Sequence, residues 1–152
     1  MRMKPLSSFE AKAVRKIFFE IFDESEDVHY NSAWRNRDCS RSLGIFSKEN
    51  DLLGFSLVEG DKLAYIGIDP LYQKDKLGTT LLNRVLEISE EQRKHINLIP
   101  AEDPRLVKWY GKHGFNVVNE EMLVSGGKRI TMNYHTYNTR FKRALRDGTV
   151  YK

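Results

Sequence analysis

Cysteine is almost missing from this sequence: Cys39 is the single one in 152 residues. An internal disulfide is therefore impossible, and a reducing compartment is the simplest expectation. The chain also lacks the run of about 18 apolar residues that a membrane span requires. Its first residues lack the apolar segment of a secretory signal. These absences predict a cytoplasmic protein with no membrane partner and disfavour a disulfide-stabilised secreted domain.

Excess charge is missing from most of the chain. The net charge is +4, and residues 133–152 alone hold five bases and one acid, an excess of +4, so the first 132 residues are neutral. A nucleic-acid-binding surface needs a wider basic face, so we do not expect nucleic acid as a partner. The length fits one domain. We assign residues 1–134 to that domain and 135–152 to a basic tail that packs on the domain or on a second subunit of a homodimer.

The N-terminal part predicts two helices joined by an acidic run. Ser8 is placed to cap a helix that ends near Phe22, because apolar residues recur at helical spacing from Phe9 onward. Residues 23–27 then carry four carboxylates and no base. The segment 29–39 is interpreted as a second helix.

The rest of the chain predicts strands interrupted by two helices, from apolar periodicity and turn residues. We expect strands at 42–47, 52–58 and 62–68, a helix at 78–91, a strand at 95–99, a helix from Asp103-Pro104 to Gly114, a strand at 115–118, and a hairpin of 122–124 with 128–132. The first three strands read as an antiparallel meander. The helix before 95–99 makes that strand a parallel neighbour of 62–68. The predicted fold class is α+β, with a mixed, mostly antiparallel central sheet, one parallel pair, and helices on both faces.

Residues 72–79 are a candidate phosphate site. They lie where an apolar strand gives way to an amphipathic helix, so the free N–H groups of the first helical turn and the helix dipole point at one spot.

Two motifs in this order identify a family. Residues 70–82, with Gln73, Lys76 and Gly78 at the key positions, are similar to the Gln/Arg-x-x-Gly-x-Gly/Ala loop and following helix of the GNAT family of N-acetyltransferases. Residues 107–115 are similar to that family's aromatic-Tyr-x-Lys-x-Gly-Phe signature. The chain therefore resembles the GNAT family over roughly residues 5–134. The resemblance implies transfer of an acetyl group from acetyl-CoA to a primary amine by direct attack in a ternary complex.

The resemblance also implies a cofactor site. Pantetheine should lie where the strands 62–68 and 95–99 separate, paired with backbone groups near Ile66 and Ile68. The pyrophosphate should bind the loop and helix start. The implied cofactor-binding residues are Ile66, Ile68, Gln73, Lys74, Asp75, Lys76, Leu77, Gly78, Thr79, Asp103 and Lys112.

Lys76 departs from the family pattern, which has glycine there because the backbone must close on the phosphates without a Cβ. The loop still closes if Lys76 keeps an ordinary helical or bridge conformation, and its ammonium then adds charge beside the phosphates. Alternatively, Lys74 and Lys76 form a solvated basic loop. Asp103 has two readings as well, pantetheine contact or simple capping before Pro104, and capping is favoured. Lys112 reaches phosphate or stays in solvent.

Tyr110 aligns with the tyrosine that the family uses as general acid. A thiolate leaving group needs a proton, which a phenol with a pKa of about 10 can supply in a dry site. The alternative is that Tyr110 only packs or donates a hydrogen bond to sulfur. The general base is not identified, because the strand 62–68 contains no carboxylate. A water chain toward Glu59, Asp61 or Asp69 is expected, and Tyr65 is the only titratable side chain in the middle of that strand.

The acidic run suggests the acceptor. In GNAT proteins the connection between the first two helices forms a wall of the acceptor site, so a negative wall here favours a polyamine or small cationic amine. The substrate-binding residues are then Asp23, Glu24, Glu26 and Asp27. The run also fits a solvated helix end. Its spacing does not fit a calcium loop, and no metal is expected. The alternatives are a protein lysine acetyltransferase, or a catalytically weak module that binds CoA or docks on nucleic acid.

Overall fold

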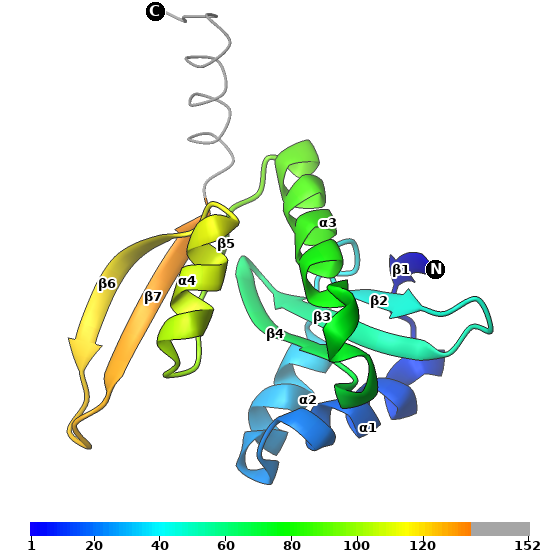
Figure 1. The fold of residues 1–152 in the computed structure, drawn as a ribbon, viewed down its shortest axis with the longest axis horizontal. Helices are drawn as coiled ribbons and strands as arrows, with labels where there is room; N and C mark the ends of the chain where they lie inside the picture. Colours follow the sequence, from blue (N-terminus) through cyan, green and yellow to red (C-terminus); the bar gives the residue numbers. More distant parts are fainter. Residues whose placement is uncertain (135–152) are drawn as a thin grey trace, which may run out of the picture. The chain divides into compact units, whose positions relative to one another are not determined.

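The computed structural model describes residues 1–134, with side chains for all of these except residues 74 and 75 (Figure 1). The chain divides into two compact units, Met1–Ile88 and Ser89–Lys152, and the boundary falls inside a helix. The predicted basic tail, residues 135–152, lies outside the described residues. Within residues 1–134, no helix is both long enough and apolar enough to cross a bilayer.

The first unit contains a run of antiparallel strands in the order β1-β2-β3-β4. Figure 1 shows α1 and α2 next to each other below these strands, with α3 crossing in front. The elements are β1 (Arg2–Pro5), the 3-10 helix η1 (Ser8–Glu10), α1 (Ala11–Ile21), the 3-10 helix η2 (Glu24–Glu26), α2 (Asp27–Arg35), β2 (Leu43–Phe46), β3 (Leu52–Glu59), β4 (Lys62–Ile68), the 3-10 helix η3 (Pro70–Asp75) and α3 (Leu77–Gln92), which continues into the second unit. The predicted meander is therefore confirmed.

The core of the first unit forms where α1 and α2 pack on β3. Val14, Ile17 and Phe18 recur at helical spacing on α1 and are buried against Phe55 and Leu57 of β3. Burying each such side chain contributes roughly 1.5–3 kcal/mol. This packing holds α1 in place, and the acidic run follows Phe22, the C-cap of the helix.

The start of the first unit differs from the prediction in two ways. The N-cap is Ser7, not Ser8, because Ser7 forms a reciprocal capping box with Glu10. Phe9, expected on the buried face, is 95% exposed, because it belongs to the 3-10 turn before the α-helical period begins. The strand β1 was not predicted. It is held by pairing with β2, about 40 residues later in the chain, and such a partner leaves no local signal.

The second unit contains three antiparallel strands in the order β5-β7-β6 and one helix. Its elements are β5 (Ile96–Leu98), α4 (Pro104–Lys112), β6 (Asn116–Met122) and β7 (Lys128–Tyr134). The predicted strands 115–118 and 122–124 are in fact one strand, β6, which pairs along its length with β7. Gly114 ends α4 with a φ of 98°, and a Cβ there would lie 2.9 Å from the Tyr134 ring. Glycine is therefore required at this turn.

A buried arginine fastens the chain between α2 and β2 to the end of β3. The Arg41 side chain is 1% exposed, forms an ion pair with Asp38 at 3.0 Å, and donates to the Gly60 carbonyl at 2.8 Å. Burial raises the pKa of Asp38, but hydrogen bonds from Ser40 and Arg41 and the charge of Arg41 outweigh it and lower this pKa from 3.8 to about 2. The ionised pair therefore stabilises the fold.

This pair predicts a pH-dependent loss of stability. Because the Asp38 pKa is lower in the folded chain, its contribution is complete above pH 4 and is lost as pH falls toward 2; it is on the order of 2 kcal/mol. Asp38→Asn should therefore lower the free energy of unfolding most at neutral pH, and the difference from wild type should shrink below pH 4, as measured by urea denaturation. Asp61→Asn is the control, because Asp61 is half exposed and 3.5 Å from Arg41. An equal loss of unfolding free energy in both variants would contradict a specific stabilising role for the Asp38–Arg41 ion pair.

Candidate active site

The loop between β4 and α3 is built by its own sequence. Asp69 follows the last residue of β4 and caps η3, since its carboxylate accepts from the Leu71 N–H at 3.0 Å. Pro70 occupies the first position of η3, where its missing N–H costs nothing. The chain therefore turns out of the strand at a fixed point and reaches α3 within one short 3-10 helix.

Lys76 connects η3 to α3 in a left-handed conformation, with φ 56° and ψ 24°. Lys76 therefore does not keep the ordinary helical or bridge conformation that was the condition for a closed loop without glycine. Instead, the turn has the geometry that favours glycine, and a lysine adopts it. Its side chain is exposed. Holding a non-glycine residue there costs roughly 1–3 kcal/mol.

The first turn of α3 begins immediately after this residue. Leu77 is buried at 3% exposure and anchors the helix start, whereas Gly78 and Thr79 are half-buried. The N–H groups of a first helical turn have no partner within the helix, and the positive end of the helix dipole lies there. This geometry suits an anion such as phosphate.

Three other predicted cofactor residues are placed by β4. Ile66 is half-buried and Ile68 is buried; both pair with β3 in an antiparallel register. The Gln73 amide donates to the Ile68 carbonyl at 3.2 Å and so ties the loop back to the strand end. Lys74 and Asp75 belong to η3, and their side chains lie outside the described set.

Tyr110 lies on α4 of the second unit and is 7% exposed. Trp109 and Phe115 contact its ring edge to face, with centroids 4.9 and 5.5 Å away. Burial raises the pKa of Tyr110 to about 12, so the phenol keeps its proton at neutral pH. Among the described residues, the hydroxyl has no hydrogen-bond partner. A fixed ring with a protonated, unengaged hydroxyl suits proton donation to a ligand.

Asp103 and Lys112 mark the two ends of α4. Asp103 caps the helix by accepting from the Arg105 N–H at 2.9 Å, and its pKa is lowered by the Arg105 side chain and backbone hydrogen bonds. The favoured reading of Asp103 as a cap is confirmed. Lys112 is the exposed last residue of the helix.

The acidic run after α1 has different roles at different positions. Asp23 caps η2 by accepting from the Ser25 N–H at 2.9 Å, and this bond lowers the Asp23 pKa. Asp27 forms an ion pair with Arg15 at 3.0 Å, which neutralises the end of the run. Glu24 is exposed. Within residues 1–134, no ion pair involves Asp23, Glu24 or Glu26.

Glu26 differs from the others because it contacts β4. Its Oε2 accepts a hydrogen bond from the Tyr65 hydroxyl at 2.7 Å. Burial, the hydrogen bond to Glu26, and the charges of Glu26 and Glu59 raise the Tyr65 pKa above its ordinary value. Sequence reasoning did not pair these residues, which are 39 positions apart. The available signal was that Tyr65 is the only titratable side chain in the middle of the strand.

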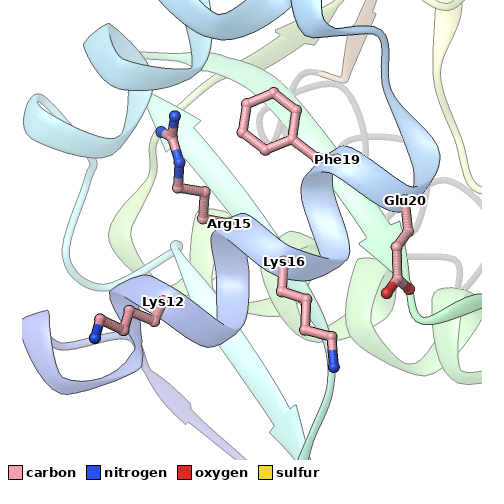
Figure 2. Close-up of a pocket in the computed structure, with 5 residues that line it drawn as sticks. All are labelled: Lys12, Arg15, Lys16, Phe19 and Glu20. Carbon is pink, nitrogen blue, oxygen red and sulfur yellow. The ribbon is translucent and has the colours of Figure 1, made fainter.

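A shallow hollow lies on the outer face of α1, lined by Lys12, Arg15, Lys16, Phe19 and Glu20 (Figure 2). The Arg15 guanidinium lies 4.8 Å from the centre of the Phe19 ring. Three of the five lining residues are basic, so this hollow does not suit an ammonium group. Glu20 therefore lies in basic surroundings, unlike the acidic residues that follow it in the chain.

The left-handed turn makes a testable prediction. Lys76→Gly should raise the free energy of unfolding by about 1 kcal/mol, because glycine adopts this conformation without strain. Lys62→Gly is the matched control: Lys62 is an exposed lysine in β4, where glycine should destabilise the chain. Denaturant unfolding measures both changes. Destabilisation by Lys76→Gly would show that its side chain contributes more than the strain costs.

Solved structures share this fold. A protein PH1933 from Pyrococcus horikoshii OT3 has a TM-score of 0.68 at 17% identity, covering 88% of this chain and 97% of its own. A GNAT-family acetyltransferase from Bacillus cereus has a TM-score of 0.65 at 15% identity, with 88% and 96% covered. Naa20 from Chaetomium thermophilum, in complex with a bisubstrate analogue, has a TM-score of 0.65 at 10% identity, with 100% and 93% covered. The predicted α+β fold of GNAT type is confirmed.

A search of curated proteins by sequence finds no match. The family model described as an acetyltransferase (GNAT) domain matches residues 11–136, which is most of the chain. The chain therefore belongs to the GNAT family of acetyl-CoA-dependent N-acetyltransferases, as its two motifs indicated.

Proposed function

We propose that this protein transfers the acetyl group of acetyl-CoA to a primary amine of a polyamine or another small cationic amine, by direct attack in a ternary complex. Family membership supports acetyl transfer to an amine. The acidic run after α1 is the observation that supports a cationic acceptor. Within the described part of the chain, its residues Asp23, Glu24 and Glu26 form no ion pairs. Such a surface raises the local concentration of polycations.

The loop after β4 supports acetyl-CoA as the donor. The left-handed Lys76 provides the turn that the family builds with glycine, and the start of α3 offers backbone donors to a pyrophosphate. Residues 76–79 would hold the phosphates, and the Lys76 ammonium would add positive charge beside them. When bound, acetyl-CoA supplies a thioester carbonyl for attack and a thiol as leaving group.

Tyr110 is proposed as the acid. Its phenol stays protonated, since burial raises its pKa to about 12. A proton moves from this hydroxyl to the departing sulfur only if the thiolate is about as basic, which requires a site from which water is excluded. The acceptor amine must itself lose a proton before it attacks, because an alkylammonium has a pKa of about 10.4.

The function is tested by mixing the protein with acetyl-CoA and separate amines: spermidine, spermine, a lysine peptide and a histone-tail peptide. We expect release of free thiol, fastest with the polyamines and slower at high salt, because salt screens the acidic run. Preference for the peptides would instead indicate a protein lysine acetyltransferase. If CoA raises the melting temperature but no amine gives thiol release, the proposal that the protein is an active acetyltransferase is contradicted.

The role of Tyr110 is tested by Tyr110→Phe. We expect kcat to fall by about 100-fold or more, with the affinity for CoA unchanged, because the substitution removes only the hydroxyl group that donates the proton. Tyr30→Phe is the matched control: Tyr30 is also a buried tyrosine, and burial raises its pKa to about 12. Steady-state thiol release and calorimetry with CoA measure the two quantities. An unchanged kcat in Tyr110→Phe would remove Tyr110 as the acid.

A further inference from the structure

The contact between Tyr65 and Glu26 joins the acidic run to the middle of β4. The Tyr65 hydroxyl lies 2.7 Å from Glu26 Oε2, and both side chains are half-buried. Within the described residues, the other carboxylate oxygen of Glu26 has no hydrogen bond. One oxygen of Glu26 is therefore held by the strand, and the second remains able to accept a hydrogen bond.

The direction of this hydrogen bond is fixed. Burial, followed by the hydrogen bond and charge of Glu26 and the charge of Glu59, raises the Tyr65 pKa well above its ordinary value. The phenol therefore stays protonated at neutral pH and donates. Glu59 accepts from Ser32 and Asn36 at 3.0 and 3.2 Å, so its carboxylate is engaged elsewhere. Glu26 is the carboxylate that Tyr65 orients.

Aromatic rings surround this contact. The Tyr65 ring lies 5.2 Å from that of Phe22 and 4.9 Å from that of Phe18, in edge-to-face arrangements. Phe18 is fully buried and Phe22 is half-buried. The packed rings hold Tyr65 in place, so the hydroxyl position is set by the core of the first unit. Aromatic rings attract cations such as alkylammonium groups, and a carboxylate beside them adds the opposite charge.

We propose that Tyr65 is a positioning residue, which holds the Glu26 carboxylate so that its second oxygen binds the ammonium of the acceptor amine. This inference rests on the proposed function, because it takes the acceptor to be cationic. It adds to that function a direct contact, between Glu26 and the acceptor ammonium, which is distinct from the general attraction of the acidic run. It favours primary ammonium groups, which donate hydrogen bonds, over quaternary ones, which do not.

Tyr65→Phe distinguishes the direct contact by Glu26 from general attraction by the acidic run, because it removes the hydroxyl and leaves every charge in place. If the acidic run acts only by general electrostatic attraction, the KM for spermidine should not change in Tyr65→Phe. The positioning role predicts a rise of about 5-fold or more in the KM for spermidine, with kcat within about 2-fold and the affinity for CoA unchanged. Glu26→Gln should raise the same KM further. In the double variant the effects should not multiply, because both changes disrupt the same contact.

Tyr134→Phe is the matched control. The Tyr134 hydroxyl donates to Glu90 at 2.6 Å, so this variant loses a similar tyrosine–glutamate hydrogen bond in the second unit. The KM for spermidine should not change. Equal rises in Tyr134→Phe and Tyr65→Phe, or an unchanged KM in Tyr65→Phe, would overturn the positioning role. A fall in kcat alone in Tyr65→Phe would do the same.

Calorimetry with spermidine on the CoA-saturated protein distinguishes failure of this inference from failure of the proposed function. Wild-type protein that binds spermidine without supporting thiol release would contradict the proposed function, and weaker binding by Tyr65→Phe would then still support the positioning role. Equal binding by wild type and Tyr65→Phe would contradict the positioning role alone. A wild-type protein that neither binds nor acetylates spermidine would contradict both.

Discussion

The positive φ of Lys76 is the constraint on which the proposed acetyl-CoA side of the site depends. It lets the chain leave η3 and enter α3 within one residue, and a lysine there is strained by roughly 1–3 kcal/mol. The helix that follows offsets this cost. Leu81, Leu82 and Val85 of α3 are fully buried, and each contributes roughly 1.5–3 kcal/mol. The packing of α3 therefore outweighs the strain at the turn and keeps the first helical turn in place.

A second constraint shapes the proposed acceptor side. The cluster of Phe18, Phe22 and Tyr65 joins α1 to β4, so the end of α1 and the middle of the strand are held together. With only Phe22 between them, the acidic run follows α1 closely, and this brings one of its members, Glu26, near Tyr65. Asp27 is neutralised by Arg15, and Asp23 is engaged as a cap. A run of similar carboxylates in the sequence thus becomes a set of residues with separate tasks.

Local signals predicted much of the fold and the elements that carry the candidate site. Helix α4 was readable because Asp103, Pro104 and Gly114 mark its ends chemically. The backbone of the proposed cofactor loop was predictable because a strand, a short turn and an amphipathic helix follow one another in the sequence. Features that depend on distant partners were missed. They include β1, whose partner is β2, and the burial of Arg41, since arginine is usually exposed and its partners become evident only in the fold. The hydrogen bond between Tyr65 and Glu26 was missed for the same reason.

We propose that backbone N–H groups at the start of α3 bind the phosphates of CoA. The most direct measurement is an amide NMR titration with CoA and, separately, with pantetheine, which lacks the phosphates. If these N–H groups bind the phosphates, the amides of residues 76–79 shift strongly with CoA and little with pantetheine. Equal shifts with both ligands, or CoA binding that leaves these amides unchanged, would contradict this proposal.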